Sequence, residues 1–224
     1  MAAKPCPENF GKRCKVFFFR LIIKTNGLRH MQPIVFATRN LNKIKEVSPL
    51  LSDKIKLQSL DDIGCDDILP ETSPTIPENA LEKARFVYQN YKVDCFAEDT
   101  GLEVEALNGE PGVYSARYAG PAHDDEANMS LLLANLKGEE DRQARFYTVI
   151  ALIIDGKEHT FEGEARGSII HHKKGNQGFG YDPLFMPEGY NRTFAQMSAE
   201  EKNAISHRGK AVKKLIDFLN QHFS

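Results

Sequence analysis

Apolar and polar residues alternate in blocks along the first half of the chain, in a pattern typical of strands followed by helices. The apolar run IVFAT predicts a buried strand over residues 34–38. Apolar residues then recur at helical spacing after Asn40, whose side chain is suited to cap a helix. The polar segment 54–77 is expected to contain a strand and a loop. A second helix over 77–91 and a second strand over 93–99 follow.

The pattern changes in the second half of the chain, where an antiparallel pair replaces this alternation. Residues 145–154 and 157–164 are strand-like segments joined at Asp155-Gly156, a dipeptide typical of hairpin turns. The other expected elements are a long loop over 100–122, a helix over 124–136, a strand over 168–172, a loop over 173–193, a helix that starts at a capping box of Ser198 and Glu201, and a last helix over 208–222. Alternating strands and helices followed by an antiparallel pair predict an α/β fold with a mixed sheet.

The composition narrows the classes of protein to consider. The chain has 224 residues, 41% of them hydrophobic, which is enough for one domain or two closely joined lobes. A net charge of −2 gives no basic field that would draw the protein to the phosphate backbone of nucleic acids. The cysteines, Cys6, Cys14, Cys65 and Cys95, are scattered without a CxxC pair. We therefore expect no disulfide framework and no zinc site, but a reduced, intracellular protein.

The first thirty residues differ from the rest of the chain. The apolar run VFFFRLII, residues 16–23, contains Arg20 and is shorter than the roughly 20 apolar residues that span a bilayer. It also lacks the long uninterrupted core of a signal peptide. We expect residues 1–30 to be a disordered extension or a wrongly assigned start, residues 31–224 to form the functional domain, and the protein to have no membrane association.

Hydrogen-bond donors gather where the first strand meets the first helix. The segment TRNLNK offers the side chains of Thr38, Asn40, Asn42 and Lys43 beside the free amides of a helix start. A helix start favours anions, so a phosphate group is a candidate ligand. The segment lacks the glycines of a P-loop, and an ordinary capped helix with a surface lysine is the alternative interpretation.

Two adjacent carboxylates, Glu98 and Asp99, stand at the predicted end of the strand over 93–99. Successive side chains of a strand point to opposite faces, so only one of the two can face a given cleft. Ligands of open α/β sheets bind beyond the carboxyl ends of strands, where a carboxylate suits Mg²⁺ binding or general-base catalysis. Glu71, in the polar segment before the second helix, could supply a second acidic ligand. A polar strand end and a solvated loop carboxylate are the alternatives.

The segment GNQGFGYDPLF, residues 175–185, carries an aromatic side chain in a glycine-rich setting. Gly178 and Gly180 let the backbone turn sharply on either side of Phe179. The Phe179 ring could stack on a flat base, and Asp182 could accept a hydrogen bond from a ring N–H. A tight loop anchored by buried aromatic residues is the alternative.

The segment AEEKNAISHRGKA, residues 199–211, gathers the basic residues Lys202, His207, Arg208 and Lys210. Lysine and arginine are suited to phosphate, and a histidine–arginine pair can donate to a carbonyl oxygen on a base. A positively charged helix face is the alternative.

Taken together, the segments TRNLNK, EDTGLEVEALNGEPGVYSARYAG, GFGYDPLF and EKNAISHRGKA occur in an order that resembles the inosine/xanthosine triphosphate pyrophosphatases, over about residues 32–222. The resemblance implies an α/β fold with an elongated mixed β-sheet flanked by helices, in two lobes with a central active-site cleft. It also implies a Mg²⁺-dependent, cytoplasmic homodimer. Such an enzyme cuts ITP, dITP and XTP between the α- and β-phosphates and so removes deaminated purine nucleotides.

The resemblance further assigns roles to single residues. Asp99 would be the general base and, together with Glu71, a metal-linked carboxylate. The residues that would contact the substrate are Thr38, Arg39, Asn40, Leu41, Asn42, Lys43 and Lys202 at the triphosphate, Thr100 beside Asp99, Phe179, Gly180, Tyr181 and Asp182 around the base, and His207 and Arg208 at its 6-oxo edge. Arg39 departs from the Gly or Asn more common in the family, and it would either tighten phosphate binding or face solvent.

Two other functions fit the same residues. One is a nucleotide-binding regulator of this fold that does not hydrolyse, against which Asp99 and Lys43 both weigh. The other is a pyrophosphatase that acts on standard dNTPs. Hydrogen-bond matching favours deaminated purines over adenine, because hypoxanthine and xanthine present an acceptor at position 6 and a donor at N1, the reverse of adenine. Guanine shares this edge, so its exclusion must act at position 2.

Overall fold

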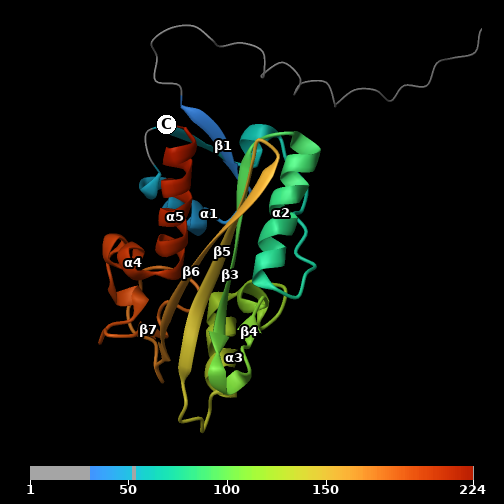
Figure 1. Ribbon diagram of the computed structural model, residues 1–224. Coiled ribbons are helices and arrows are strands. Elements are labelled where there is room, and N and C mark those ends of the chain that lie inside the picture. Colours follow the sequence, from blue (N-terminus) through green and yellow to red (C-terminus); the bar gives the residue numbers. More distant parts are fainter. Residues whose placement is uncertain (1–30, 52–53, 224) are drawn as a thin grey trace, which may run out of the picture. The chain divides into compact units, whose positions relative to one another are not determined.

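The structure is a computed structural model that describes residues 31–51 and 54–223. These residues form a seven-stranded sheet with the order β2-β1-β3-β5-β6-β7, and β4 pairs beside β3 (Figure 1). The strands are β1 (Gln32–Phe36), β2 (Ile55–Gln58), β3 (Cys95–Val104), β4 (Pro111–Gly112), β5 (Gln143–Ile154), β6 (Lys157–Ile169) and β7 (Phe185–Pro187). β1 runs parallel to β2 and β3, and the other pairs are antiparallel. The mixed sheet and the α/β class predicted from the sequence are confirmed.

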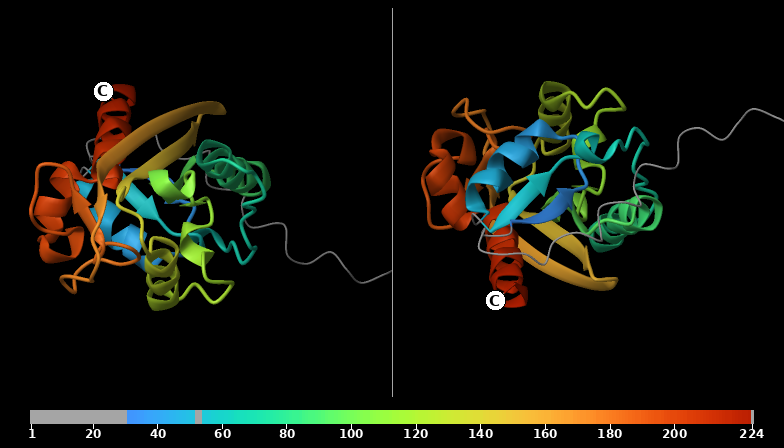
Figure 2. Two further views of the ribbon diagram at one scale, coloured as in Figure 1. Left: turned by 90° about the horizontal axis from the view of Figure 1, so that it is seen from below. Right: turned by 90° about the horizontal axis from the view of Figure 1, so that it is seen from above.

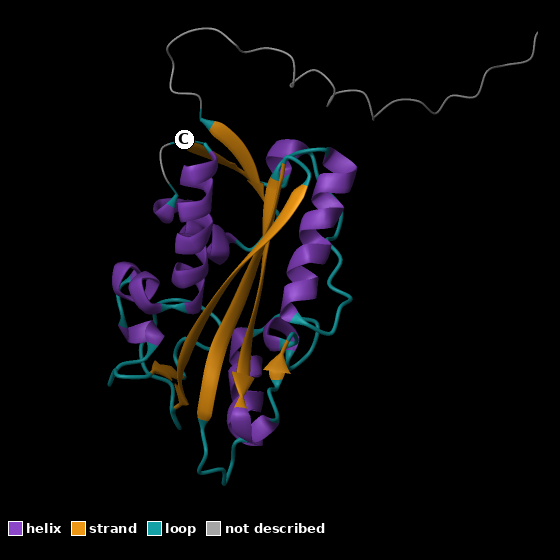
Figure 3. Ribbon diagram, in the orientation of Figure 1, coloured by secondary structure: helices purple, strands orange, loops and turns teal. Residues whose placement is uncertain are grey.

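Helices cover both faces of this sheet (Figure 3). The α-helices of the described residues are α1 (Leu41–Val47), α2 (Ile76–Tyr91), α3 (Asp125–Asn135), α4 (Ala199–Ile205) and α5 (His207–His222). Short 3₁₀ turns lie at Ser48–Leu50, Asp61–Ile63, Glu105–Leu107, Ser115–Arg117 and Phe194–Gln196. α2 packs against β3 and β5, whereas α5 packs against β5 and β6. Seen along the strands, the β5–β6 hairpin curves between α5 and α2 (Figure 2).

The period of two along β3 separates the two faces of the sheet. Cys95 and Ala97 belong to the apolar cluster that includes Ala80, Ala84 and Val87 of α2. Phe96, which lies between them in the chain, belongs instead to the cluster around α5. The same alternation continues along the strand, as predicted.

Local helix signals are confirmed by the structure. Asn40 caps α1, and Ser198 forms a capping box with Glu201 at the start of α4. α1 ends at Val47, earlier than the apolar spacing suggests, and Pro49 lies in the 3₁₀ turn that follows. Proline has no amide hydrogen to continue an α-helix, which accounts for the early end.

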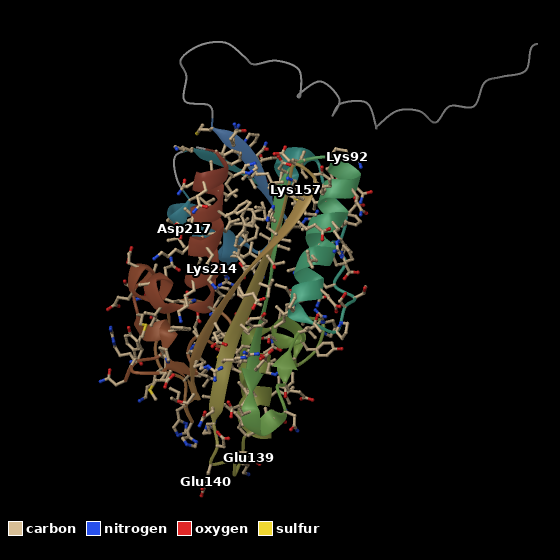
Figure 4. All side chains as sticks on the ribbon, in the orientation of Figure 1. Lys92, Glu139, Glu140, Lys157, Lys214 and Asp217 are labelled. Carbon is tan, nitrogen blue, oxygen red and sulfur yellow. The ribbon has the colours of Figure 1, made fainter. Side chains whose placement is uncertain are left out.

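The β5–β6 hairpin extends over nearly the whole sheet. Lys157, where β6 begins, lies at one end, and Glu139 and Glu140, which precede β5, lie at the other (Figure 4). α5 starts directly against this hairpin. The approach at Gly163 is so close that a Cβ atom there would lie 2.0 Å from the backbone oxygen of His207. A glycine in β6 thus lets the residues after Ser206 approach the sheet closely.

Strand ends differ from the prediction at two places. β3 continues to Val104 instead of ending at Asp99, so the loop predicted over 100–122 was wrong in its first residues. β3 pairs with β5 along the whole length of β3, from Cys95 to Val104. This long-range pairing keeps the residues beyond Asp99 extended. The strand predicted over 168–172 is the end of β6, which stops at Ile169, and β7 lies within the loop predicted over 173–193.

The described cysteines are free, as expected, and both are buried. Cys65 and Cys95 form no disulfide, and burial raises the pKa of the Cys95 thiol to about 12. Across residues 31–51 and 54–223, no helix has the length and apolar character that crossing a membrane requires. The predictions for residues 1–30 lie outside the described part of the chain.

Candidate active site

The cavity that gathers the predicted site opens where β1 stops and β3 continues. β1 ends at Phe36, beside Phe96, whereas β3 runs on to Val104. The cavity has a volume of about 600 Å³. The predicted residues that line it are Thr38, Arg39, Asn40, Asn42, Lys43, Glu71, Asp99, Thr100, Phe179, Gly180, Tyr181, Asp182, Lys202, His207 and Arg208. Leu41, in contrast, is 68% exposed and lies outside the lining.

The loop before α1 presents side-chain donors to this cavity. Asn40 Oδ1 accepts hydrogen bonds from the backbone amides of Asn42 (3.0 Å) and Lys43 (3.2 Å), so the cap already uses these two amides. The Lys43 ammonium lies 3.3 Å from the backbone oxygen of Glu98 on β3. Burial lowers the pKa of Lys43, although the charge of Glu98 opposes this shift. The donors suited to an anion here are therefore the side chains of Thr38, Asn42 and Lys43.

A buried lysine joins the two carboxylates predicted to serve a metal. Lys83 Nζ, on α2, lies 2.8 Å from Asp99 Oδ1 and 2.6 Å from Glu71 Oε1. Arg117 approaches the other oxygen of Glu71 at 3.3 Å. Asp99 Oδ2 is buried and has no hydrogen-bond partner among the described residues. One oxygen of Asp99 is thus held by the protein, and the other is available for a ligand.

The environment gives these carboxylates different proton affinities. Burial raises the pKa of Asp99, and the Lys83 ammonium only partly offsets this effect. Burial acts in the same direction on Glu71, but the charge of Lys83 outweighs it and lowers the pKa of Glu71. Lys83 itself has a raised pKa, because Asp99 and Glu71 outweigh the effect of burial. Asp99 is therefore the better proton acceptor of the two.

Glu98 lies on the opposite face of β3, where its carboxylate binds the guanidinium of Arg208. It accepts hydrogen bonds from Arg208 Nε at 3.0 Å and Nη2 at 2.7 Å, and from the Thr100 hydroxyl. Burial alone would raise its pKa, but the charges of Arg208 and then Lys43 outweigh burial and lower it. Glu98 is 1% exposed, so it orients Arg208 and Thr100 from within the protein.

Two cations and a carboxylate surround the ring of Phe179. Lys202 Nζ lies 5.3 Å from the ring centroid, and Arg208 Cζ lies 5.4 Å from it. Asp182 Oδ2 accepts hydrogen bonds from Lys202 Nζ (2.6 Å) and from the Phe179 amide (2.9 Å). The contacts of Lys202 therefore lie at the aromatic end of the cavity, although the sequence placed this residue at the triphosphate. Gly180 is fixed nearby, where its amide donates to Asp125 Oδ2 at 2.8 Å.

Tyr181 and His207 contribute buried groups to the same end. The Tyr181 hydroxyl donates to the backbone oxygen of Ser115 at 2.9 Å, which ties the loop after β6 to the 3₁₀ turn Ser115–Arg117. His207 stacks on Phe146 with ring centroids 4.6 Å apart. Burial, then the charge of Arg208, lowers the pKa of His207 well below its usual value, so the imidazole is neutral. His207 Nδ1 is buried without a hydrogen-bond partner among the described residues.

The carboxylates can be tested for a fit to a divalent cation. No group of three or more His, Cys, Asp or Glu side chains in the described residues is arranged to hold a metal ion. Mg²⁺, however, binds few protein oxygens and takes the remainder from water and substrate phosphates. The unpartnered Oδ2 of Asp99 and the ionised Glu71, on either side of Lys83, fit such a site.

Known proteins resemble this chain in both sequence and fold. A sequence model described as the Ham1 family matches residues 34–218. This chain belongs to the Ham1 family. The dITP/XTP pyrophosphatase of Flavobacterium psychrophilum is 58% identical over 185 residues, which cover 83% of this chain and 97% of that protein. The dITP/XTP pyrophosphatase of Porphyromonas gingivalis is 50% identical over 190 residues, which cover 84% of this chain and 98% of that protein.

Solved structures give the same result. The Ham1 protein of Staphylococcus aureus has a TM-score of 0.79 at 39% identity, and the match covers 85% of this chain and 100% of that one. The nucleoside-triphosphatase / dITP/XTP pyrophosphatase of Mycobacterium abscessus has a TM-score of 0.69 at 44% identity, over 83% and 99% of the two chains. The family resemblance found in the sequence is confirmed.

The hydrogen bonds of Arg39 to the described residues are to the protein's own backbone. Its guanidinium donates to the backbone oxygens of Cys65 and, at 2.7 Å, Asp67. The Tyr91 hydroxyl also donates to the Asp67 carboxylate at 2.8 Å. Arg39 therefore ties the loop before α1 to the segment that leads to Glu71. Its predicted contact with phosphate stays a prediction.

Sequence reasoning missed several charged residues of this Ham1-family site, among them Lys83 and Glu46. Lys83 stands within the apolar stripe of α2, between Ala80 and Ala84, and a lysine at such a position signals a buried partner. Glu46 on α1 accepts hydrogen bonds from Lys202 and Arg208. The residues around Glu46 carry no such signal, because both of its partners lie more than 150 residues away in the chain.

Proposed function

We propose that the protein is a Mg²⁺-dependent pyrophosphatase that hydrolyses ITP, dITP and XTP between the α- and β-phosphates. The products are the nucleoside monophosphate and pyrophosphate. The observation that carries the proposal is the unpartnered, buried Oδ2 of Asp99 in one cavity with Lys43 and Phe179. Relatives named dITP/XTP pyrophosphatase support the substrate class.

Asp99 serves as the general base. Its Oδ2 accepts the proton of the water that attacks the α-phosphorus, while Lys83 holds Oδ1 and so orients the carboxylate. The raised pKa of Asp99 strengthens it as a proton acceptor. Lys43 and Asn42 donate to the triphosphate and stabilise the charge that develops on the leaving pyrophosphate.

Asp99 and Glu71 are the residues that would hold Mg²⁺. When bound, the ion neutralises phosphate charge and polarises the phosphorus–oxygen bonds. Lys83 keeps the two carboxylates close together, because its ammonium contacts both. Arg117 adds a second positive charge beside Glu71.

The base is recognised at the opposite end of the cavity. The purine stacks on Phe179, Asp182 accepts from N1–H, and Lys202 donates to the oxygen at position 6. We place Lys202 here because its ammonium already contacts Asp182 and lies over Phe179. Adenine would set two donors against Lys202 and leave Asp182 without a proton to accept, which disfavours it.

The test is pyrophosphate release by the full chain with Mg²⁺ on ITP, dITP, XTP, ATP and GTP. We expect kcat/KM for ITP to exceed that for ATP by about 10⁴. Similar values for ATP and ITP would support a pyrophosphatase of standard nucleotides instead. Tight nucleotide binding without any release of pyrophosphate would support a binding regulator. A homodimer and a cytoplasmic location accompany the proposal as expectations of the family resemblance.

A further inference from the structure

Glu46 links the two cations at the aromatic end of the cavity. Its Oε1 accepts from Lys202 Nζ at 2.7 Å, and its Oε2 accepts from Arg208 Nη1. The Glu46 side chain is 15% exposed, and it lines an adjoining cavity behind Lys202 instead of the cavity of the site. Glu46 therefore contacts Lys202 and Arg208 from outside the cavity of the site.

The charges around Phe179 explain why such a link is needed. Lys202 and Arg208 both lie within 5.4 Å of the same ring centroid, so two positive charges share a small, largely buried volume. Asp182 pairs with Lys202, and Glu98 pairs with Arg208. Glu46 is the carboxylate that these two cations have in common among the described residues. Burial would raise its pKa, but Arg208 and then Lys202 outweigh burial and lower it, so Glu46 is ionised at neutral pH.

The geometry also fixes the direction of the protons of Lys202. An ammonium group has three N–H donors. Among the described residues, two of them point to Asp182 and Glu46. The first two contacts fix the direction of the third donor, and Lys202 lines the cavity of the site.

From these contacts we infer that Glu46 is a positioning residue for base selectivity, an inference that rests on the proposed function. Glu46 orients Lys202 so that its remaining N–H meets an acceptor at position 6 of the purine. Without this carboxylate the ammonium can rotate, and the donor no longer has a fixed direction. The distinction between a 6-oxo and a 6-amino purine then weakens, although Glu46 itself does not contact the base.

The test compares Glu46→Gln with Glu200→Gln as a matched control. Glutamine keeps the volume of Glu46 but sets an amide donor against one of the two cations. Glu200 is an exposed glutamate of α4 that contacts the Ser198 hydroxyl and borders the same adjoining cavity. Pyrophosphate release is measured for both variants and the wild type on dITP and dATP, and thermal unfolding shows whether each variant is folded.

For Glu46→Gln we expect a KM for dITP raised by about tenfold and a dITP/dATP ratio of kcat/KM lowered by about tenfold, the effect of one lost charged hydrogen bond. We expect kcat for dITP to change much less than KM. Glu200→Gln should keep the wild-type ratio. Glu46→Asp, which retains the charge, should recover part of the selectivity, and it serves as the test variant if Glu46→Gln does not fold.

An unchanged dITP/dATP ratio in folded Glu46→Gln overturns the inference. So does an equal loss of kcat on both nucleotides, which indicates a structural role alone. The wild type distinguishes failure of this inference from failure of the proposed function. If the wild type does not release pyrophosphate from dITP, the proposed function itself is contradicted.

Discussion

At the residue scale, Glu98 and Asp99 show how adjacent carboxylates acquire different roles. They point to opposite faces of β3, so Glu98 meets Arg208 and Asp99 meets Lys83. The pKa of Glu98 is lowered because the charge of Arg208 outweighs burial, whereas burial raises the pKa of Asp99. Glu98 therefore remains a carboxylate that orients its neighbours, and Asp99 is the one that we propose as the proton acceptor.

Asp99→Asn tests that assignment. The amide is close to the carboxylate in shape but cannot accept the proton of the attacking water, so kcat should fall by about 10²–10⁴. Nucleotide binding should persist, because Lys43 and Phe179 are unchanged. Pyrophosphate release gives kcat, and calorimetric titration with ITP gives the affinity. Near-normal turnover would remove Asp99 from the role of general base.

At the element scale, ion pairs connect helices and loops to the sheet around the cavity. Lys83 joins α2 to β3 through Asp99 and to the preceding loop through Glu71. Lys202 and Arg208 join the C-terminal helices to α1 through Glu46. The side chains of Lys83, Asp99, Lys202 and Arg208 are at most 11% exposed. Removing one member of such a pair leaves the other charge buried and unpaired.

Lys83→Met should therefore destabilise the fold, while Arg85→Met on the same helix should not. The free energy of unfolding of Lys83→Met should fall by about 3 kcal/mol, because Asp99 loses its buried partner. Arg85 pairs with Glu158 at side-chain exposures of 49% and 40%, where such a pair contributes below about 1 kcal/mol. Urea unfolding at pH 7 with EDTA measures both. Equal effects of the two variants would contradict a stabilising role for the buried pair.

At the scale of the whole molecule, the neutral His207 makes folding stability depend on pH. Its pKa in the folded state is well below the usual 6.5, so only the unfolded state binds a proton there as pH falls. The stabilisation is complete above about pH 6.5 and is lost as pH decreases below it. The carboxylates Glu46, Glu71 and Glu98, whose pKa values are lowered, retain their contribution down to about pH 4.5.

Between pH 6.5 and 5 we expect the free energy of unfolding to fall by up to about 1.4 kcal/mol per pH unit because of His207. His207→Gln should remove this part of the slope, whereas the exposed His171→Gln should retain it. Urea unfolding at half-unit pH steps measures the slopes. The same slope in all three proteins would show that His207 is not its source.

Much of this architecture follows from short-range patterns. The Asn40 cap, the Ser198 capping box and the hairpin at Asp155-Gly156 depend on residues a few positions apart, and the structure contains each of them. The opposite orientation of Glu98 and Asp99 follows from the strand period alone. Fifteen of the sixteen predicted site residues line one cavity, and Leu41 is the exception because it points to solvent.

Long-range pairing decided the remainder. β3 extends past Asp99 because β5, some fifty residues later, supplies hydrogen-bond partners as far as Val104. Lys83 and Glu46 acquire their roles only when α2 and α1 approach carboxylates and cations from distant segments. Local patterns in the sequence predicted most of the residues that line the cavity and the direction in which each one points from its own strand or helix, since such properties depend on near neighbours. Which charges face each other became visible only in the folded chain, since that depends on how separate elements pack.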